Sequence, residues 1–129
     1  MKLPILLVTF LLSYARHDLP NPDDILGKWI NIPKENTIIE VYKNQNNEYN
    51  GKIVWAKNND QKKPIGFIIL EKLKYDPESK NWDNGKIHDP NSGKTYSAAA
   101  KIKNDGTLEV LGYMGFKFFG TTKSFRKIK

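Results

Sequence analysis

The side chains of this chain whose chemistry could serve catalysis are two histidines and a few neighbouring hydroxyl and carboxyl groups. His17 lies in a polar, proline-rich stretch, and His88 stands beside Asp89 at the end of an apolar segment. Ser92 and Ser97 follow shortly afterwards, so serine, histidine and aspartate are all present. However, neither serine is surrounded by a nucleophile elbow or a supporting oxyanion motif. We therefore expect that the protein is not an enzyme.

The same histidines and carboxylates also give no sign of a metal site. The chain contains no cysteine, which excludes thiolate ligands, thiol catalysis and disulfide bonds. A metal site needs about three converging protein ligands, and the spacing of the histidines and carboxylates supplies no such set. The run at 88–93, His-Asp-Pro-Asn-Ser-Gly, is more simply a turn, because Asp and Asn bond nearby backbone and Pro fixes φ. We expect no metal and no other cofactor.

The charge of the chain favours anionic partners without specifying one. It has 21 Lys and Arg against 14 Asp and Glu, a formal net charge of +7. Nearly all the basic residues are scattered lysines; Arg16 and Arg126 are the two arginines. Base readout and bidentate phosphate binding rely on arginine, so we expect no nucleic-acid partner.

The first fifteen residues have the features of an export signal in the expected order. Lys2 supplies a positive start, Leu3–Leu12 is a short apolar run, and small residues stand at Ser13 and Ala15. The apolar run is too short to span a bilayer, which takes about 20 residues. We therefore expect a signal peptide at 1–15, cleavage before Arg16, and export to the periplasm or the medium.

The remaining residues, 16–129, fit the usual size of one domain and predict a run of short strands. Asn21-Pro22-Asp23-Asp24 has the pattern of a helix start, so at most one short helix is expected there. After it, β-branched and aromatic runs alternate with Asn, Asp, Gly and Pro clusters at the spacing of an all-β domain. The predicted strands are Lys28–Ile32, Thr37–Lys43, Tyr49–Trp55, Phe67–Tyr75, Trp82–His88, Thr95–Lys103, Thr107–Met114 and Phe118–Ile128.

A simple up-and-down meander of these eight strands predicts a closed antiparallel β-barrel. Alternate connections then share one end, which separates short hairpins from two longer loops, Ala56–Gly66 and Asp89–Lys94. Eight strands enclose an interior just large enough for one small ligand. Closure also removes exposed strand edges, which matters for an exported domain without disulfides.

Gly27 and Trp29 on the first strand, with Arg126 near the end of the last, resemble the lipocalin signature. That resemblance implies that Arg126 stacks on Trp29 at the hairpin end of the barrel. A larger set of segments resembles a bacterial family of small exported proteins of unknown function with a lipocalin-like barrel. This family often has Trp and Cys where this chain has Phe125 and Ala98, and the resemblance implies no catalytic residues. The segments that carry it are Gly27–Trp29, Tyr49–Trp55, Pro64–Gly66, Trp82–Pro90, Ser92–Tyr96, Leu108–Tyr113 and Phe119–Thr121.

Small residues within the predicted strands allow two interpretations of the interior. They either serve bulges and close packing or leave room for a ligand. These small residues are Gly51, Gly85, Ala98, Ala100, Gly112 and Gly120. Strand alternation places Ile53 with Trp55 on one face, and Tyr96 with Ala98 and Ala100 on one face. The predicted ligand lining is Ile53, Trp55, Tyr96, Ala98, Ala100, Met114 and Phe118.

The sequence therefore predicts an exported lipocalin-like protein that sequesters or carries a small apolar or amphipathic molecule, with the Ala56–Gly66 loop gating the mouth. The alternative is a non-catalytic interaction module whose loops or basic surface bind a protein or an anionic envelope component. An open apolar cavity favours the first interpretation, whereas an interior filled by side chains favours the second.

Overall fold

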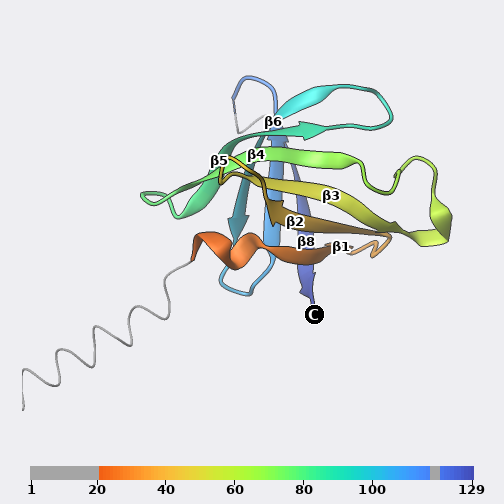
Figure 1. Ribbon diagram of the computed structural model, residues 1–129, viewed down its shortest axis with the longest axis horizontal. Coiled ribbons are helices and arrows are strands. Elements are labelled where there is room, and N and C mark those ends of the chain that lie inside the picture. The colour runs from red at the N-terminus through yellow and green to blue at the C-terminus, as the bar shows by residue number, and fades with distance from the viewer. Residues whose placement is uncertain (1–20, 117–119) are drawn as a thin grey trace, which may run out of the picture.

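Eight antiparallel strands follow one another around a closed barrel in the computed structural model, which describes residues 21–116 and 120–129 (Figure 1). Each strand pairs with its neighbours in the chain, and the first closes on the last. The predicted eight-stranded up-and-down barrel is thereby confirmed. The elements are η1 (Pro22–Ile25), β1 (Gly27–Ile32), β2 (Thr37–Lys43), β3 (Tyr49–Ala56), η2 (Lys57–Asn59), β4 (Ile68–Asp76), β5 (Asn81–His88), β6 (Thr95–Ile102), β7 (Leu108–Tyr113) and β8 (Thr121–Ile128).

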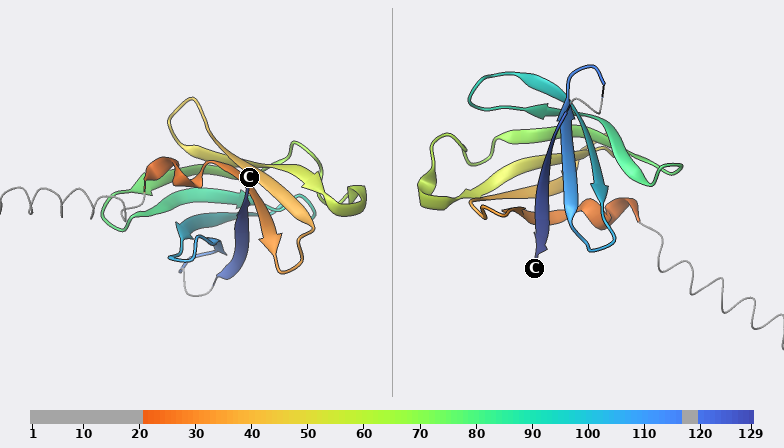
Figure 2. Two further views of the ribbon diagram at one scale, coloured as in Figure 1. Left: turned by 90° about the horizontal axis from the view of Figure 1, so that it is seen from below. Right: turned by 180° about the vertical axis from the view of Figure 1, so that it is seen from behind.

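The connections divide between two ends of a strongly twisted barrel. The hairpin end carries the turns at 44–48, 77–80 and 103–107. The loop-rich end carries 33–36, 57–67, 89–94 and 114–120. Figure 2 shows the long β3–β4 and β5–β6 loops projecting on the same side of the molecule. The predicted leader, Met1–Ala15, lies outside the described residues.

A single turn of 3₁₀ helix precedes the barrel where the sequence predicts a short helix. The side chain of Asn21 accepts a hydrogen bond from the backbone N–H of Asp23 at 2.9 Å. The carboxylate of Asp24 accepts from the backbone N–H of Asn21 at 2.9 Å, which completes a capping box. Pro22 occupies the first helical position, where its missing N–H costs nothing.

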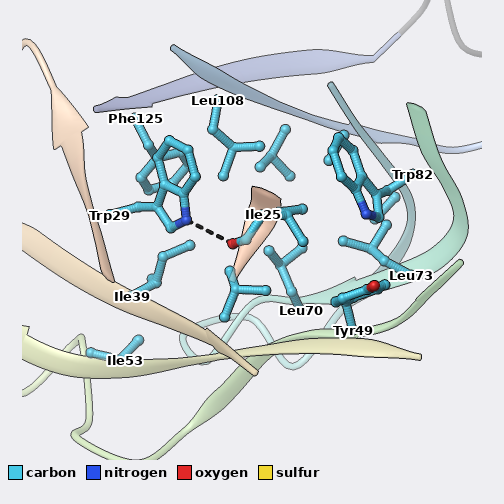
Figure 3. Packing of buried hydrophobic residues seen from close by; sticks show 14 residues of the cluster. Ile25, Trp29, Ile39, Tyr49, Ile53, Leu70, Leu73, Trp82, Leu108 and Phe125 are labelled. Carbon is cyan, nitrogen blue, oxygen red and sulfur yellow. Dashed lines mark hydrogen bonds between the residues drawn. The ribbon is translucent and has the colours of Figure 1, made fainter. Parts of the chain in front are cut away.

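The helix η1 covers the hairpin end of the barrel and is held there by two indoles. The Nε1–H of Trp29 donates to the carbonyl of Ile25 at 2.9 Å (Figure 3). The Nε1–H of Trp82 donates to the carbonyl of Pro22 at 3.1 Å. Ile25 is fully buried and packs into the core between these rings. This end of the barrel is therefore closed by the chain itself.

Buried side chains from every strand and from η1 meet inside the barrel and pack against one another (Figure 3). The 14 members of this cluster are Ile25, Trp29, Ile39, Val41, Tyr49, Ile53, Leu70, Leu73, Trp82, Ala98, Ala100, Leu108, Val110 and Phe125. Burial of this apolar area is the main favourable contribution to folding in a chain without disulfides.

The small residues on the inner face admit close packing. Gly85 pairs with Ala98, and Ala98 with Gly112, so three small residues lie side by side across β5, β6 and β7. A Cβ atom added at Gly85 would lie only 2.7 Å from Cδ2 of Leu73. One added at Gly51 would lie 3.3 Å from Leu70. Large neighbours thus fill the space that the missing side chains leave, as the packing interpretation expects.

Candidate functional site

Three of the predicted lining residues, Ile53, Ala98 and Ala100, are buried members of the packed core. Tyr96, from the same predicted face, is half-buried nearer the loop-rich end. These four residues do face the interior, but three of them contact other core side chains instead of open space. The sixth strand therefore has the alternation that the sequence predicts.

The prediction that Trp55 shares a face with Ile53 is wrong. Ile39 pairs with Ile53 whereas Ile38 pairs with Trp55, so Val54 is an extra residue in β3. Such a bulge reverses the alternation that follows it. Ile53 consequently points into the core, whereas Trp55 is 41 % exposed.

Met114 also lies outside the interior, because β7 ends at Tyr113 and the chain leaves the barrel there. Its side chain is 68 % exposed. Phe118, the last of the predicted lining residues, lies outside the described residues.

The predicted stacking of Arg126 on Trp29 is wrong, and its neighbour Lys127 occupies that place. Lys127 pairs with Trp29 across β8 and β1, and its Nζ lies 4.7 Å from the centre of the indole. The same ammonium donates to the carbonyl of Leu26, while burial lowers the pKa of this amine. Arg126 instead binds the exposed carboxylate of Glu35 at 2.7 Å. Gly27 and Trp29 lie beside the ammonium group of Lys127, which takes the position predicted for Arg126. Lys127 thereby completes the cover of the hairpin end.

A hollow of about 600 Å³ opens at the loop-rich end, between the start of β4 and the β5–β6 loop. Its apolar wall comes from Phe67, Ile68 and Pro90, and its polar edge comes from Glu71, His88 and Asp89. Gly66 and Gly93 complete the lining. Both glycines adopt positive φ with open space around them, so they allow tight turns at the rim.

A chain of hydrogen bonds crosses three strands at the edge of this hollow. His88 pairs with Thr95 across the β5–β6 hairpin, and its Nδ1 lies 2.8 Å from the hydroxyl of that threonine. Its Nε2 lies 2.8 Å from the Glu71 carboxylate on β4. An ionised carboxylate only accepts, so Nε2 donates; in the neutral ring Nδ1 then accepts from the Thr95 hydroxyl.

The loop after His88 is the turn that the sequence predicts. The carboxylate of Asp89 accepts from the backbone N–H of Asn91 and the hydroxyl of Ser92, each at 2.9 Å. The hydrogen bond from Asn91, followed by that from Ser92, holds the pKa of Asp89 below its usual range. Asp89 therefore stays ionised at the rim of the hollow through the neutral pH range.

Carboxylate, imidazole and hydroxyl form the kind of chain that nucleophilic catalysis uses, but here they lie at an open, solvated edge. Preorganised charge stabilisation is strongest where water is excluded. The hydroxyl of Ser92, one of the two serines near His88 in the sequence, donates to Asp89. Across residues 21–116 and 120–129, no three His, Asp or Glu side chains are grouped to hold a metal ion.

The exposed large apolar side chains among the described residues gather at this same end of the barrel. They are Trp55, Ile65, Ile68, Met114 and Phe116. Two lie in or beside the β3–β4 loop, one starts β4, and two lie on the β7–β8 connection. Exposed apolar groups at one site mark a binding surface more often than scattered ones do. No helix in the described ranges is long and apolar enough to cross a membrane.

Sequence reasoning missed Glu71, Thr95 and Lys127. The pairing of His88 with Thr95 follows directly from the predicted hairpin around Asp89–Lys94, so that contact carried a usable signal. Lys127 stands two residues after buried Phe125 along β8, and that parity places it on the same face, beside Trp29 at the end of the barrel. Glu71 carried no such signal, because its approach to His88 depends on the register between β4 and β5.

Comparison with known proteins gives one family and a similar solved structure. A family model described as "Uncharacterized protein conserved in bacteria (DUF2147)" matches residues 27–127. A solved structure from Helicobacter pylori, reported as protein HP1028 of the lipocalin family, is similar with a TM-score of 0.63 and 14 % identity. The similarity covers 81 % of this chain and 83 % of that one, and it shows a lipocalin-like fold. No curated protein matches the sequence.

Proposed function

The chain belongs to the DUF2147 family of bacterial proteins, and on that premise we propose that it is a non-catalytic binding protein for a small apolar or amphipathic molecule. The lipocalin-like barrel supports this proposal, since barrels of this size hold small ligands. The observation that carries it is the hollow at the loop-rich end, with an apolar wall and a polar edge. Small-molecule sites usually combine those two features.

The proposed site lies at the loop-rich end on the outer side of β4 and β5, not at the centre of the barrel. The core packs closely around Gly51, Gly85 and Ala98, so a ligand there would have to displace buried side chains. In the hollow, Phe67 and Ile68 offer an apolar wall without such a cost. This proposal differs from the ligand lining that the sequence predicts and keeps the same class of ligand.

The polar edge limits the chemistry of the bound molecule. His88 is already bonded to Glu71 and Thr95, which fixes the orientation of its ring. The Asp89 carboxylate and the free lone pairs of the Glu71 carboxylate accept hydrogen bonds. A ligand with a hydroxyl, amide or amine group beside an apolar body therefore fits this edge best.

The filled interior also supports a second candidate, an interaction module that binds a protein or an anionic envelope component through its loops. In that case the exposed apolar side chains at the loop-rich end would form the centre of the interface. The two candidates differ in whether a small molecule occupies the hollow on its own. Native mass spectrometry of protein purified from its own host distinguishes them, because a bound small molecule would add a discrete mass.

We also propose export to the periplasm or the medium, on the evidence of Lys2, the apolar run Leu3–Leu12 and the small residue Ala15. Terminal sequencing of the exported protein tests this proposal. Cleavage predicts Arg16 as the first residue, whereas an intact Met1 in the exported fraction contradicts it.

Titration with a neutral fluorescent probe that carries a hydroxyl or amide group beside an apolar body tests the binding site. Ile68→Glu places a charge on the apolar wall and should weaken probe binding at least about tenfold, the effect of losing roughly 1.4 kcal/mol of apolar contact. Asn46→Glu adds the same charge at an exposed turn of the hairpin end and should leave binding unchanged. Equal binding by both variants, or no binding by the unmodified protein, would contradict the proposal.

A further inference from the structure

The connection between β3 and β4 exposes apolar and basic side chains together. Trp55 is 41 % exposed at the end of β3, and Ile65 is 64 % exposed just before β4. Lys62 lies on the same loop and is exposed, with Lys57 exposed where the loop begins. The loop contains three lysines and one aspartate over residues 57–66, so it is positively charged.

Backbone hydrogen bonds hold the apolar parts of this connection side by side. The N–H of Gly66 donates to the carbonyl of Ile53 at 2.7 Å, and the N–H of Ile53 donates to the carbonyl of Phe67 at 3.0 Å. Gly66, which follows Ile65, is therefore paired with Ile53, which stands two residues before Trp55. The bulge at Val54 turns Trp55 outward, so its indole is presented on the surface instead of filling the core.

The one acidic residue of the loop shapes its turn. The carboxylate of Asp60 accepts from the backbone N–H of Lys62 at 3.0 Å, and its carbonyl accepts from the N–H of Lys63 at 3.0 Å. Both bonds use backbone N–H groups; the side chain of Lys62 is exposed and that of Lys63 is half-buried. The turn thus presents Lys62 and Lys63 immediately before Pro64 and Ile65.

We propose that this segment, residues 55–65, docks the protein on the surface of an anionic lipid bilayer. Indoles favour the interfacial region of a bilayer, and an exposed aliphatic side chain favours the acyl boundary below it. Lysines close to the surface are attracted to anionic headgroups by about 1 kcal/mol each. The centres of protein interfaces are depleted in lysine, so this combination fits a bilayer better than a protein partner.

A second loop at the same end adds apolar side chains to the docking surface. Met114 is 68 % exposed and Phe116 is 67 % exposed on the β7–β8 connection. The hairpin end, in contrast, is covered by η1 and the buried indoles of Trp29 and Trp82. Among the described residues, the exposed large apolar side chains therefore lie at the loop-rich end, and docking would direct that end toward the lipid.

Co-sedimentation with vesicles tests the docking proposal. The purified protein should sediment with vesicles of phosphatidylcholine mixed with phosphatidylglycerol, and much less with phosphatidylcholine alone or at high salt. Lys62→Glu combined with Lys63→Glu should lower the partition coefficient at least about tenfold, from the loss of two attractions of about 1 kcal/mol each. The control, Lys103→Glu combined with Lys129→Glu, changes the same charge at exposed positions of the hairpin end and the C-terminus and should have little effect.

Tryptophan fluorescence supplies an independent readout, because Trp29 and Trp82 are buried whereas Trp55 is exposed. Anionic vesicles should shift the emission to shorter wavelength and protect it from iodide, and Trp55→Phe should abolish both changes. Equal partitioning of the two lysine variants, or unchanged iodide quenching of Trp55 on vesicles, would overturn the proposal. Because these measurements use bilayers and leave Ile68 intact, their failure is separate from failure of the small-molecule site.

Discussion

Replacing Gly85 by alanine should reveal how closely the interior of the barrel is packed. The new Cβ would lie 2.7 Å from Cδ2 of Leu73, 2.8 Å from its Cγ and 3.1 Å from the carbonyl oxygen of Glu71. Leu73 is fully buried, and the Glu71 contact is to backbone, so neither neighbour can move away freely. Overpacking of this kind costs about 1–3 kcal/mol, against which alanine recovers about 0.4–1 kcal/mol through the unfolded chain.

Two other glycines provide a graded comparison. A Cβ at Gly51 would approach the Leu70 side chain to 3.3 Å, and one at Gly112 would approach Ile87 at 3.4 Å. Urea denaturation should therefore place Gly85→Ala lowest in stability, by a net of about 1–2 kcal/mol, with Gly51→Ala intermediate and Gly112→Ala nearly neutral.

A double substitution separates crowding from other effects of the change. Leu73→Ala alone should cost about 2–5 kcal/mol by leaving a cavity, and Gly85→Ala should cost less in that background, because the contact is gone. Unchanged stability of Gly85→Ala in the otherwise unmodified protein, or the reverse order among the glycines, would refute close packing at this level of the barrel.

Three further predictions concern the core and the hairpin end. Ala98→Phe should cost at least about 1–3 kcal/mol in chemical denaturation, because this buried position has no room for a ring; a neutral effect would indicate an open cavity. Lys127→Ala should lower stability by about 1–2 kcal/mol, because packing and a hydrogen bond are lost. Arg126→Ala should cost under about 1 kcal/mol, because its ion pair with Glu35 is exposed. Equal midpoints for the two variants in thermal denaturation would contradict this ranking. The hydrogen bond from Tyr49, followed by that from Lys43, lowers the pKa of Asp23. These contacts therefore stabilise the folded protein above about pH 4, and their contribution is lost as the pH falls through the folded pKa of Asp23. Tyr49→Phe should raise the Asp23 pKa in an NMR titration, and an unchanged value would exclude that hydrogen bond as the cause.

The strands could be predicted because alternation and turn residues are local properties of the sequence. Asn21 and Pro22 likewise predict η1 by themselves, since capping needs only the residues around the helix start. The predicted ligand lining was less successful, because one bulged residue at Val54 turns Trp55 outward. Bulges depend on how two strands pair, and a pattern within a single strand does not reveal them.

The same limit explains the exchange of roles between Arg126 and Lys127. Both stand near the end of β8, and only the pairing of Lys127 with Trp29 decides which side chain reaches the indole. The site at the loop-rich end depends even more on register, because His88 meets Glu71 from a third strand. Such contacts between strands become visible only once the barrel is assembled.

The central claim is that a small molecule binds at the loop-rich end of a filled barrel, on the outer side of β4 and β5. Amide and methyl NMR shifts test it most directly, measured during titration with a neutral apolar probe that carries a hydroxyl or amide group. Saturable shifts should occur at Phe67, Ile68 and His88, while the methyl groups of Ala98 and Val110 in the core should remain unchanged. Large shifts at those two core methyls, or no saturable shift anywhere, would contradict the claim.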